Sequence, residues 1–223
     1  MVRLDLGHVV LPDWHPRHAD GVCALFGYAV DHPDGVVVFD TGCGVGNEFI
    51  DAVYEPAVVD IVDALNAASI DERDVGAIVN SHLHFDHCGQ NHRLPHAPFW
   101  VQAEERDVAR TEFFTVPEWA DVDSDRIRVA GDTEVIAPGV TIVATPGHTP
   151  GHQSLLVETG AGLEIVAGQP CYTCAEFTSA SPDPDDMFDA SHFEMGLDSI
   201  RRLAALDTMA VHLAHDAESI VRP

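Results

Sequence analysis

Four side chains that can bind a metal ion lie within six positions near the middle of the chain: His82, His84, Asp86 and His87. Imidazole nitrogens and carboxylate oxygens together suit zinc, manganese or iron. His82 and His84 are separated by one residue and can point the same way, whereas Asp86 and His87 follow a bend and can face a second centre. The spacing predicts that one short loop serves two metal sites. The alternative is a histidine-rich loop exposed to solvent.

The elements that must position this loop are strands. The apolar segment 75–79 is short and bounded by turn residues, which predicts a buried strand that ends at the loop. The segment 140–144 predicts another strand, which leads into Pro146-Gly147-His148-Thr149-Pro150-Gly151-His152. The prolines there fix part of the backbone and with it the position of His148. We expect ligands from separate strand ends to meet along one edge of the fold.

Other segments predict the layers around these strands. Segments 22–30 and 35–40 flank a turn and predict a hairpin. Residues 56–68 have apolar side chains at helical spacing, with Pro56 suited to the first turn. Residues 192–206 predict a second helix with one apolar face. This order of strands and helices indicates a layered α/β architecture.

The run His82-x-His84-x-Asp86-His87 resembles the signature of the metallo-β-lactamase-fold hydrolases. Two more segments are similar to signatures of that family: Asp40-Thr41-Gly42, after an apolar strand, and the segment around His148. The resemblance implies an α/β fold of the four-layer αβ/βα sandwich type. It also implies that Asp40 braces the metal-binding loop through hydrogen bonds, although Asp40 taken alone also fits an ordinary turn.

The resemblance implies two sets of metal ligands. His82, His84 and His148 would hold the first ion, Asp86, His87 and His215 would hold the second, and Gln169 would sit between them. His152 would lie behind the ligands. His212 is an alternative to His215, but it would be buried in the middle of a strand.

Gln169 is the main departure from the family pattern, because relatives carry at this position an aspartate whose carboxylate bridges two metals. A glutamine offers one neutral carbonyl oxygen. Two divalent ions, a hydroxide, Asp86 and a bridging aspartate would sum to about +1, and Gln169 raises the sum to about +2. Three outcomes follow: two ions with reduced affinity, one ion, or a degraded site. We expect two zinc ions, with one ion, or manganese or iron, as alternatives.

Tyr172 follows Gln169 by three residues. A tyrosine at this offset, with the stretches 81–87 and 101–105, resembles the N-acyl homoserine lactonase branch of the family. The resemblance implies a metal-dependent hydrolase that opens a lactone or related ester by attack of a metal-bound hydroxide. Tyr172 would help to stabilise the oxyanion and Asp86 would help to move the proton to the leaving alkoxide. Packing is the alternative role for Tyr172.

Three other functions remain open. A glyoxalase II-like thioester hydrolase would use the same metals, but such relatives usually end in a helical portion with basic residues for glutathione. A mononuclear iron persulfide oxygenase would need only one metal. The substitution at Gln169 also permits a pseudoenzyme that binds metal or ligand without catalysis.

The composition narrows the class of protein. The chain has 223 residues, of which 46% are hydrophobic, and we expect one domain over residues 1–223. Its 11 Arg and Lys residues against 37 Asp and Glu residues give a formal charge of −26, which would repel nucleic acid. We therefore expect a small-molecule substrate.

The sequence also bears on location. No apolar run reaches the roughly 18 residues of a membrane span, and the first residues do not resemble a signal peptide, so we expect no membrane association and a cytoplasmic protein. The five cysteines form no framework spacing, which favours reduced thiols. The oligomeric state is open, with a homodimer as one option.

Overall fold

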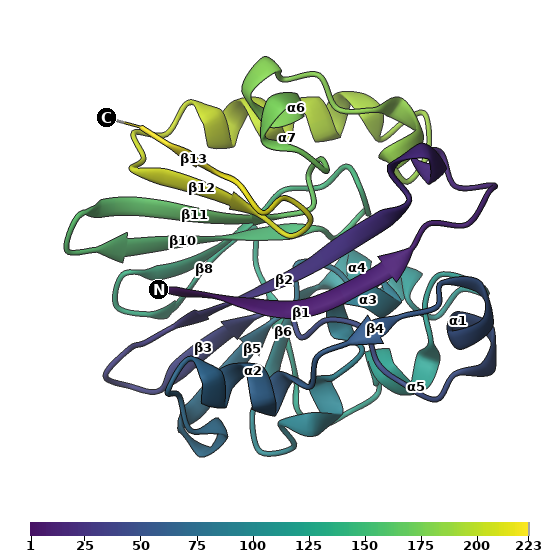
Figure 1. The fold of residues 1–223 in the computed structure, drawn as a ribbon. Coiled ribbons are helices and arrows are strands. Elements are labelled where there is room, and N and C mark those ends of the chain that lie inside the picture. The colour runs from purple at the N-terminus through teal and green to yellow at the C-terminus, as the bar shows by residue number, and fades with distance from the viewer. Residues whose placement is uncertain (223) are drawn as a thin grey trace.

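Two β-sheets pack face to face in a computed structural model that describes residues 1–222 (Figure 1). The first sheet has the order β4-β1-β2-β3-β5-β6-β7 and the second has the order β13-β12-β11-β10-β9-β8. The strands of the first sheet are β1 (Val2–Val10), β2 (Val22–Val30), β3 (Val36–Phe39), β4 (Ala57–Val58), β5 (Val75–Val79), β6 (Phe99–Gln102) and β7 (Ile127–Ala130). Those of the second are β8 (Thr133–Ala137), β9 (Val140–Ala144), β10 (Gln153–Thr159), β11 (Gly162–Gly168), β12 (Ala210–Leu213) and β13 (Ser219–Val221).

Helices cover the outer face of each sheet. Figure 1 shows α6 and α7 above the second sheet and the other helices on the opposite side of the molecule. The helices are α1 (Glu48–Val53), α2 (Ile61–Ala67), α3 (Phe85–Cys88), α4 (Ala103–Val108), α5 (Pro117–Ala120), α6 (Cys174–Ser179) and α7 (Phe193–Ala204). Short 3-10 helices are η1 (His18–Asp20), η2 (Glu72–Asp74), η3 (Asn91–Arg93) and η4 (Pro184–Asp186).

The alternation of side chains along β3 shows how the layers form. Val36 and Val38 lie in the core between the first sheet and its helices, whereas Val37 and Phe39 lie in the core between the two sheets. A third core joins the second sheet to α6 and α7. Because β3 is buried on both faces, it is apolar throughout, as strands of covered sheets are. The three cores separate four layers, which confirms the predicted αβ/βα sandwich.

Most predicted elements are present, and one helix was placed wrongly. The hairpin of β2 and β3 and the strands at 75–79 and 140–144 are confirmed. The helix expected over 56–68 begins only at Ile61, where Asp60 accepts a hydrogen bond from the Val62 amide. Pro56 is not in its first turn, because residues 57–58 form β4 against β1 instead.

Two further findings concern the whole chain. None of the helices within residues 1–222 is long and apolar enough to cross a membrane. All five cysteines are free thiols, as expected, and only Cys174 is not fully buried.

Candidate active site

The ends of strands from both sheets meet at one place, and each carries a polar residue there. Asp40 follows β3, the segment 80–87 follows β5, and Gln169 follows β11. His148 comes from the loop between β9 and β10, and His215 from the end of β12. The sandwich therefore brings together possible metal ligands that are up to 133 positions apart, between His82 and His215.

The first cluster contains His82, His84 and His148, as the sequence predicts. The Nδ1 atom of His84 lies 3.0 Å from His82 Nε2 and 3.1 Å from His148 Nε2. His82 is fully buried, and the His84 ring packs against Phe114. Three imidazole nitrogens thus converge on one point.

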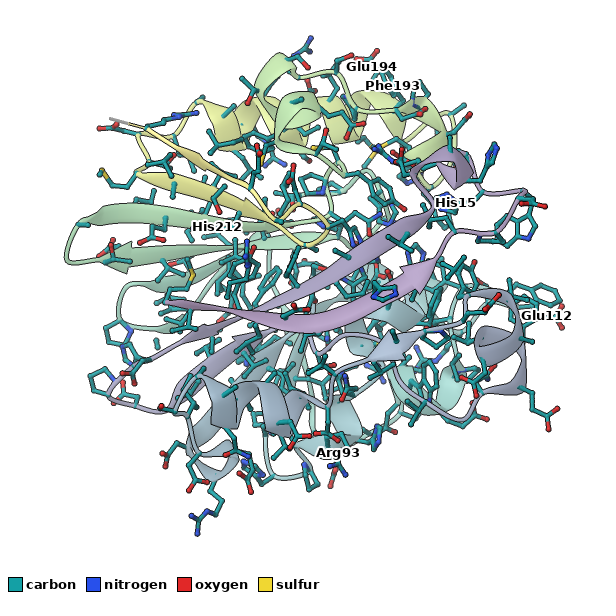
Figure 2. All side chains as sticks on the ribbon, in the orientation of Figure 1. His15, Arg93, Glu112, Phe193, Glu194 and His212 are labelled. Atoms are coloured by element: carbon teal, nitrogen blue, oxygen red, sulfur yellow. The ribbon has the colours of Figure 1, made fainter. Side chains whose placement is uncertain are left out.

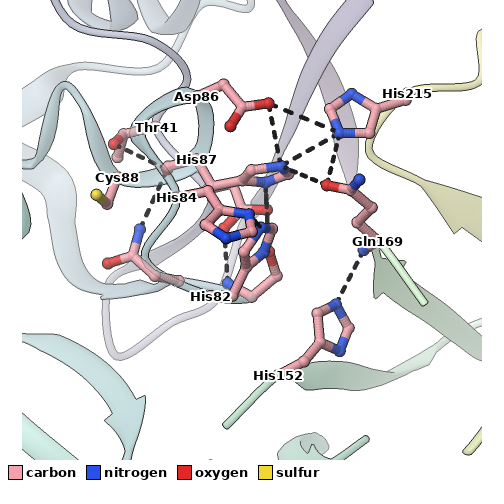
Figure 3. Close-up of polar contacts among 12 residues, drawn as sticks. Thr41, His82, His84, Asp86, His87, Cys88, His152, Gln169 and His215 are labelled. Atoms are coloured by element: carbon pink, nitrogen blue, oxygen red, sulfur yellow. Dashed lines mark hydrogen bonds and ion pairs between the residues drawn. The ribbon is translucent and has the colours of Figure 1, made fainter. Parts of the chain in front are cut away.

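The second cluster contains Asp86, His87 and His215. His87 Nε2 lies 3.2 Å from His215 Nε2, and Asp86 Oδ2 lies 3.5 Å and 3.8 Å from the same two nitrogens. Figure 3 shows the carbonyl oxygen of Gln169 beside this cluster, 3.1 Å from His87 Nε2 and 2.9 Å from His215 Nε2. Gln169 is thus in hydrogen-bonding contact with two ligands of the second set.

The spacing of the ligand atoms fits a transition metal. A tetrahedral zinc site with metal–ligand bonds of about 2.0–2.1 Å places its ligand atoms about 3.3 Å apart. The distances in the first cluster are close to this value. Those in the second are similar for the two histidines and longer for Asp86. Both clusters can accept one ion each with small adjustments of side chains.

The electrostatics prepare the histidines for metal binding. Burial lowers the pKa of His84 to about 3 and those of His148 and His215 to about 4, so these rings are neutral and offer lone pairs. Burial alone would also lower the pKa of His87, but the carboxylates of Asp86 and Asp40 raise it to about 9. A metal ion must therefore displace a proton from His87.

Groups behind the ligands fix their orientation. Asp40 accepts hydrogen bonds from the Ser81 amide at 2.6 Å, the Ser81 hydroxyl at 2.7 Å and His87 Nδ1 at 2.8 Å. These are the bracing contacts that the resemblance implies for Asp40. His148 donates from Nδ1 to the carbonyl of Asp186, and this bond leaves His148 Nε2 free for a metal.

The remaining ligands are braced in the same way. His215 Nδ1 donates to the carbonyl oxygen of Ala24 at 2.8 Å, which leaves Nε2 for a metal. His152 lies behind the ligands, as predicted, because its Nε2 accepts the Gln169 amide at 3.0 Å. His212, on β12, lies outside both clusters. It contacts Ser219 on β13 and Glu164 on β11.

Glu105 is a site residue whose role the sequence did not reveal. Its buried carboxylate accepts hydrogen bonds from the Leu83 amide, between two ligand histidines, and from Thr149 and Gly151, next to His148. Burial raises the pKa of Glu105 to about 7, and the three donors oppose that rise. The one available signal was the family-like stretch 101–105. Its partner at Thr149, 44 positions away, could not be read from local pattern.

A pocket of about 950 Å³ opens beside the two clusters. Asp86, Gln169 and Tyr172 line the part of the pocket next to the second cluster, which we call its floor, and Tyr172 stacks on His215 with ring centroids 5.1 Å apart. Phe113 and Phe114 also line the pocket. Its walls are mostly apolar, with Trp14, Tyr54 and Phe85 among them. Trp119 instead packs against the core beneath the first sheet.

Comparisons with known proteins agree with this geometry. Residues 20–215 match the metallo-beta-lactamase superfamily. An N-acyl homoserine lactonase from a Bacillus species is 32% identical over 207 residues, which cover 86% of this chain and 80% of the relative. The lactonase AttM from Rhizobium radiobacter is 32% identical over 162 residues, which cover 58% of each chain.

Solved structures give the same picture. An N-acyl homoserine lactone hydrolase, with the product N-hexanoyl-L-homoserine bound at its catalytic metal center, has a TM-score of 0.80 and 25% identity. The alignment covers 96% of this chain and 92% of that one. A dizinc quorum-quenching lactonase, AidC, has the same fold, with a TM-score of 0.68 and 15% identity over 91% of this chain and 80% of that one.

The chain belongs to the metallo-beta-lactamase superfamily. Within that superfamily its similarity is to the N-acyl homoserine lactonases, which confirms the resemblance predicted from Tyr172 and the flanking stretches.

Proposed function

We propose that this protein is a metal-dependent hydrolase that opens the ring of N-acyl homoserine lactones or closely related lactones. The observation that carries the proposal is the position of Tyr172, which lines one apolar pocket together with His84, Asp86 and His148 from the two ligand clusters. The similarity to lactonases over 86% of the chain supports the same substrate class.

The proposal assigns two metal ions, with zinc as the preferred metal. His82, His84 and His148 would hold one ion, and Asp86, His87 and His215 the other, with the Gln169 carbonyl beside the second set. When bound, such ions lower the pKa of a water molecule and polarise a carbonyl oxygen. We also propose that residues 1–223 form one domain, which acts on a small molecule in the cytoplasm. A homodimer stays a prediction.

Tyr172 would act as a hydrogen-bond donor. Burial raises its pKa well above the usual value, so the phenol keeps its proton. A protonated phenol at the floor of the pocket can donate to the carbonyl oxygen as negative charge develops there. We therefore expect the Tyr172 side chain to stabilise the transition state more strongly than it stabilises the bound lactone.

Asp86 would transfer a proton to the leaving alkoxide. Burial alone would raise its pKa, but the neighbouring His87 and His215 lower it, so the carboxylate is ionised. An ionised carboxylate at the pocket floor can take a proton and return it to the alkoxide that leaves when the ring opens.

Release of acid tests the proposal, because each opened lactone frees one proton. We expect zinc-loaded protein to turn over N-hexanoyl homoserine lactone in a pH-stat. Tyr172→Phe should lower kcat by about 100-fold, the scale of one lost oxyanion donor, with unchanged zinc content. His84→Ala should remove both activity and one bound ion. His96→Ala, at an exposed position, serves as the control.

Other outcomes would redirect the assignment. Faster turnover of thioesters than of lactones would favour a glyoxalase II-like activity, and oxygen consumption by iron-loaded protein would favour an oxygenase. Metal-loaded protein that binds lactones without turnover would be a pseudoenzyme, and the proposed function would then be wrong.

A further inference from the structure

The loop between β1 and β2 places one histidine on the wall of the active-site pocket. His15 lies on this loop, as Figure 2 shows, and lines the same pocket as Asp86, Gln169 and Tyr172. Two turns hold its backbone: its amide donates to the carbonyl of Pro12 at 2.8 Å, and its carbonyl accepts the His18 amide at 2.9 Å. The ring is therefore presented by a fixed backbone.

The tautomer of His15 is fixed as well. The backbone amide of Arg17 donates to His15 Nδ1 at 3.1 Å, so that nitrogen carries the lone pair. Burial lowers the pKa of His15, which keeps the ring neutral. A neutral ring with an acceptor at Nδ1 has its proton on Nε2. Within residues 1–222 no protein group accepts that proton.

His15 is adjacent to the residue that would stabilise the reacting carbonyl. Its ring centroid lies 6.3 Å from that of Tyr172, edge to face, and 6.2 Å from that of Trp14. Two other polar side chains that line the pocket are engaged elsewhere, whereas the Thr115 hydroxyl is buried without a partner. Asn47 caps α1, and Arg110 pairs with Asp107 and Asp123. His15 is thus a free donor beside the reacting group in a mostly apolar pocket.

We propose that His15 Nε2–H binds the amide carbonyl oxygen of an acylamino lactone and thereby selects such substrates over simple alkyl lactones. The inference rests on the proposed function and adds a residue that distinguishes between lactones. An acylamino lactone carries its amide group on the carbon next to the ring carbonyl. A donor close to Tyr172 can therefore reach the amide oxygen while Tyr172 contacts the ring. An alkyl lactone offers no acceptor there.

Two lactones and three proteins test the inference. We would measure kcat/KM for N-hexanoyl homoserine lactone and for α-hexyl-γ-butyrolactone, which carries an apolar tail on the same ring carbon and has no amide. His15→Asn keeps a side-chain oxygen for the Arg17 amide, as in an Asx turn, and its shorter side chain holds its own N–H groups back from the position of His15 Nε2. We expect this variant to lose about tenfold on the acylamino lactone, the scale of one hydrogen bond, and less than about twofold on the alkyl lactone. His96→Asn, at an exposed position, should match wild type on both.

Each outcome has one meaning. Equal losses on both lactones would show that His15 supports Tyr172 and does not select substrates, and no loss on either would show that it plays no part. Both results would overturn the inference and leave the proposed function in place. Wild-type protein that holds its metals and opens neither lactone would overturn the proposed function itself.

Discussion

Gln169 places a neutral amide where a negative charge would be expected to hold a second metal. Its side-chain oxygen lies 3.1 Å from His87 Nε2 and 2.9 Å from His215 Nε2, and its backbone N–H donates to His152 Nε2. Gln169 is thus held by hydrogen bonds, as the ligand histidines are. What differs is the charge of the donor, and with it the affinity for the second ion.

A carboxylate at this position should tighten the second site. A unit charge about 4 Å from an ion contributes roughly 4 kcal/mol at an effective dielectric of 20, before the cost of burying it. We expect Gln169→Asp to lower the Kd of the second zinc ion by about tenfold or more, in competition with a fluorescent chelator. Gln169→Asn, which is as short and remains neutral, is the matched control. Equal affinities for Asp and Asn would show that charge at this position does not limit binding.

At the scale of elements, Glu105 joins two loops that each carry ligands of the first cluster. Its carboxylate accepts from Leu83 on one loop and from Thr149 and Gly151 on the other. Glu105→Gln keeps the side-chain volume but replaces one carboxylate oxygen with an NH2 group. Its two N–H donors would face the amides and hydroxyl that now donate to Glu105. We expect zinc affinity of the first site to fall by about 10–100-fold, as for other groups that orient ligands. Glu104→Gln, on the exposed side of α4, should leave the affinity unchanged.

Arg17 joins the β1–β2 loop to the elements around Tyr172. Its guanidinium lies over the Tyr172 ring at 4.5 Å, pairs with Glu176 at 2.7 Å and approaches Asp186 at 3.7 Å. Glu176 in turn accepts the amide of Tyr172. Replacement of Arg17 should therefore disturb both the phenol of Tyr172 and the turn at Asp186, whose carbonyl accepts a hydrogen bond from His148.

We expect Arg17→Met to lower kcat on lactones by about tenfold and Arg17→Lys to restore only part of it, because an ammonium cannot stack and pair in two directions at once. KM should change less than kcat. A thermal melt would show whether the loss comes from unfolding. Wild-type kcat in folded Arg17→Met would exclude this positioning role.

Metal ligands and the residues that orient the site differ in how far the sequence could predict them. The ligands at 82–87 stand close after an apolar strand, so strand pattern and short-range spacing predict them, whereas His148 and His215 were assigned as ligands through the family resemblance. Arg17 and Glu176 are 159 positions apart, and no local pattern pairs them. The same limit explains the helix at 56–68. Its first residues pair with β1, and that tertiary contact overrides the helical spacing.

At the scale of the whole molecule, the dominant feature is the excess of acidic side chains. All 11 basic residues are arginines, and they face 37 aspartates and glutamates. Ion pairs such as Arg17 with Glu176 occupy part of the arginine set, which leaves most acids without a cation. Like charges spread over one compact surface repel each other, and unfolding relieves that repulsion.

Salt should therefore stabilise this protein. The Debye length falls from about 10 Å at 0.1 M to about 3 Å at 1 M salt, which screens repulsion between exposed acids. Each 1 kcal/mol of stability gained should raise Tm by about 2–4 °C for a chain of this size, measured by calorimetry in potassium chloride at constant metal content. Asp31, Asp132 and Asp207 are exposed and form no side-chain contact among the described ion pairs and hydrogen bonds. Changing all three to Asn should raise Tm at low salt and flatten its rise with salt. A Tm that does not respond to potassium chloride would show that the acidic surface is already neutralised by its own arginines and bound ions.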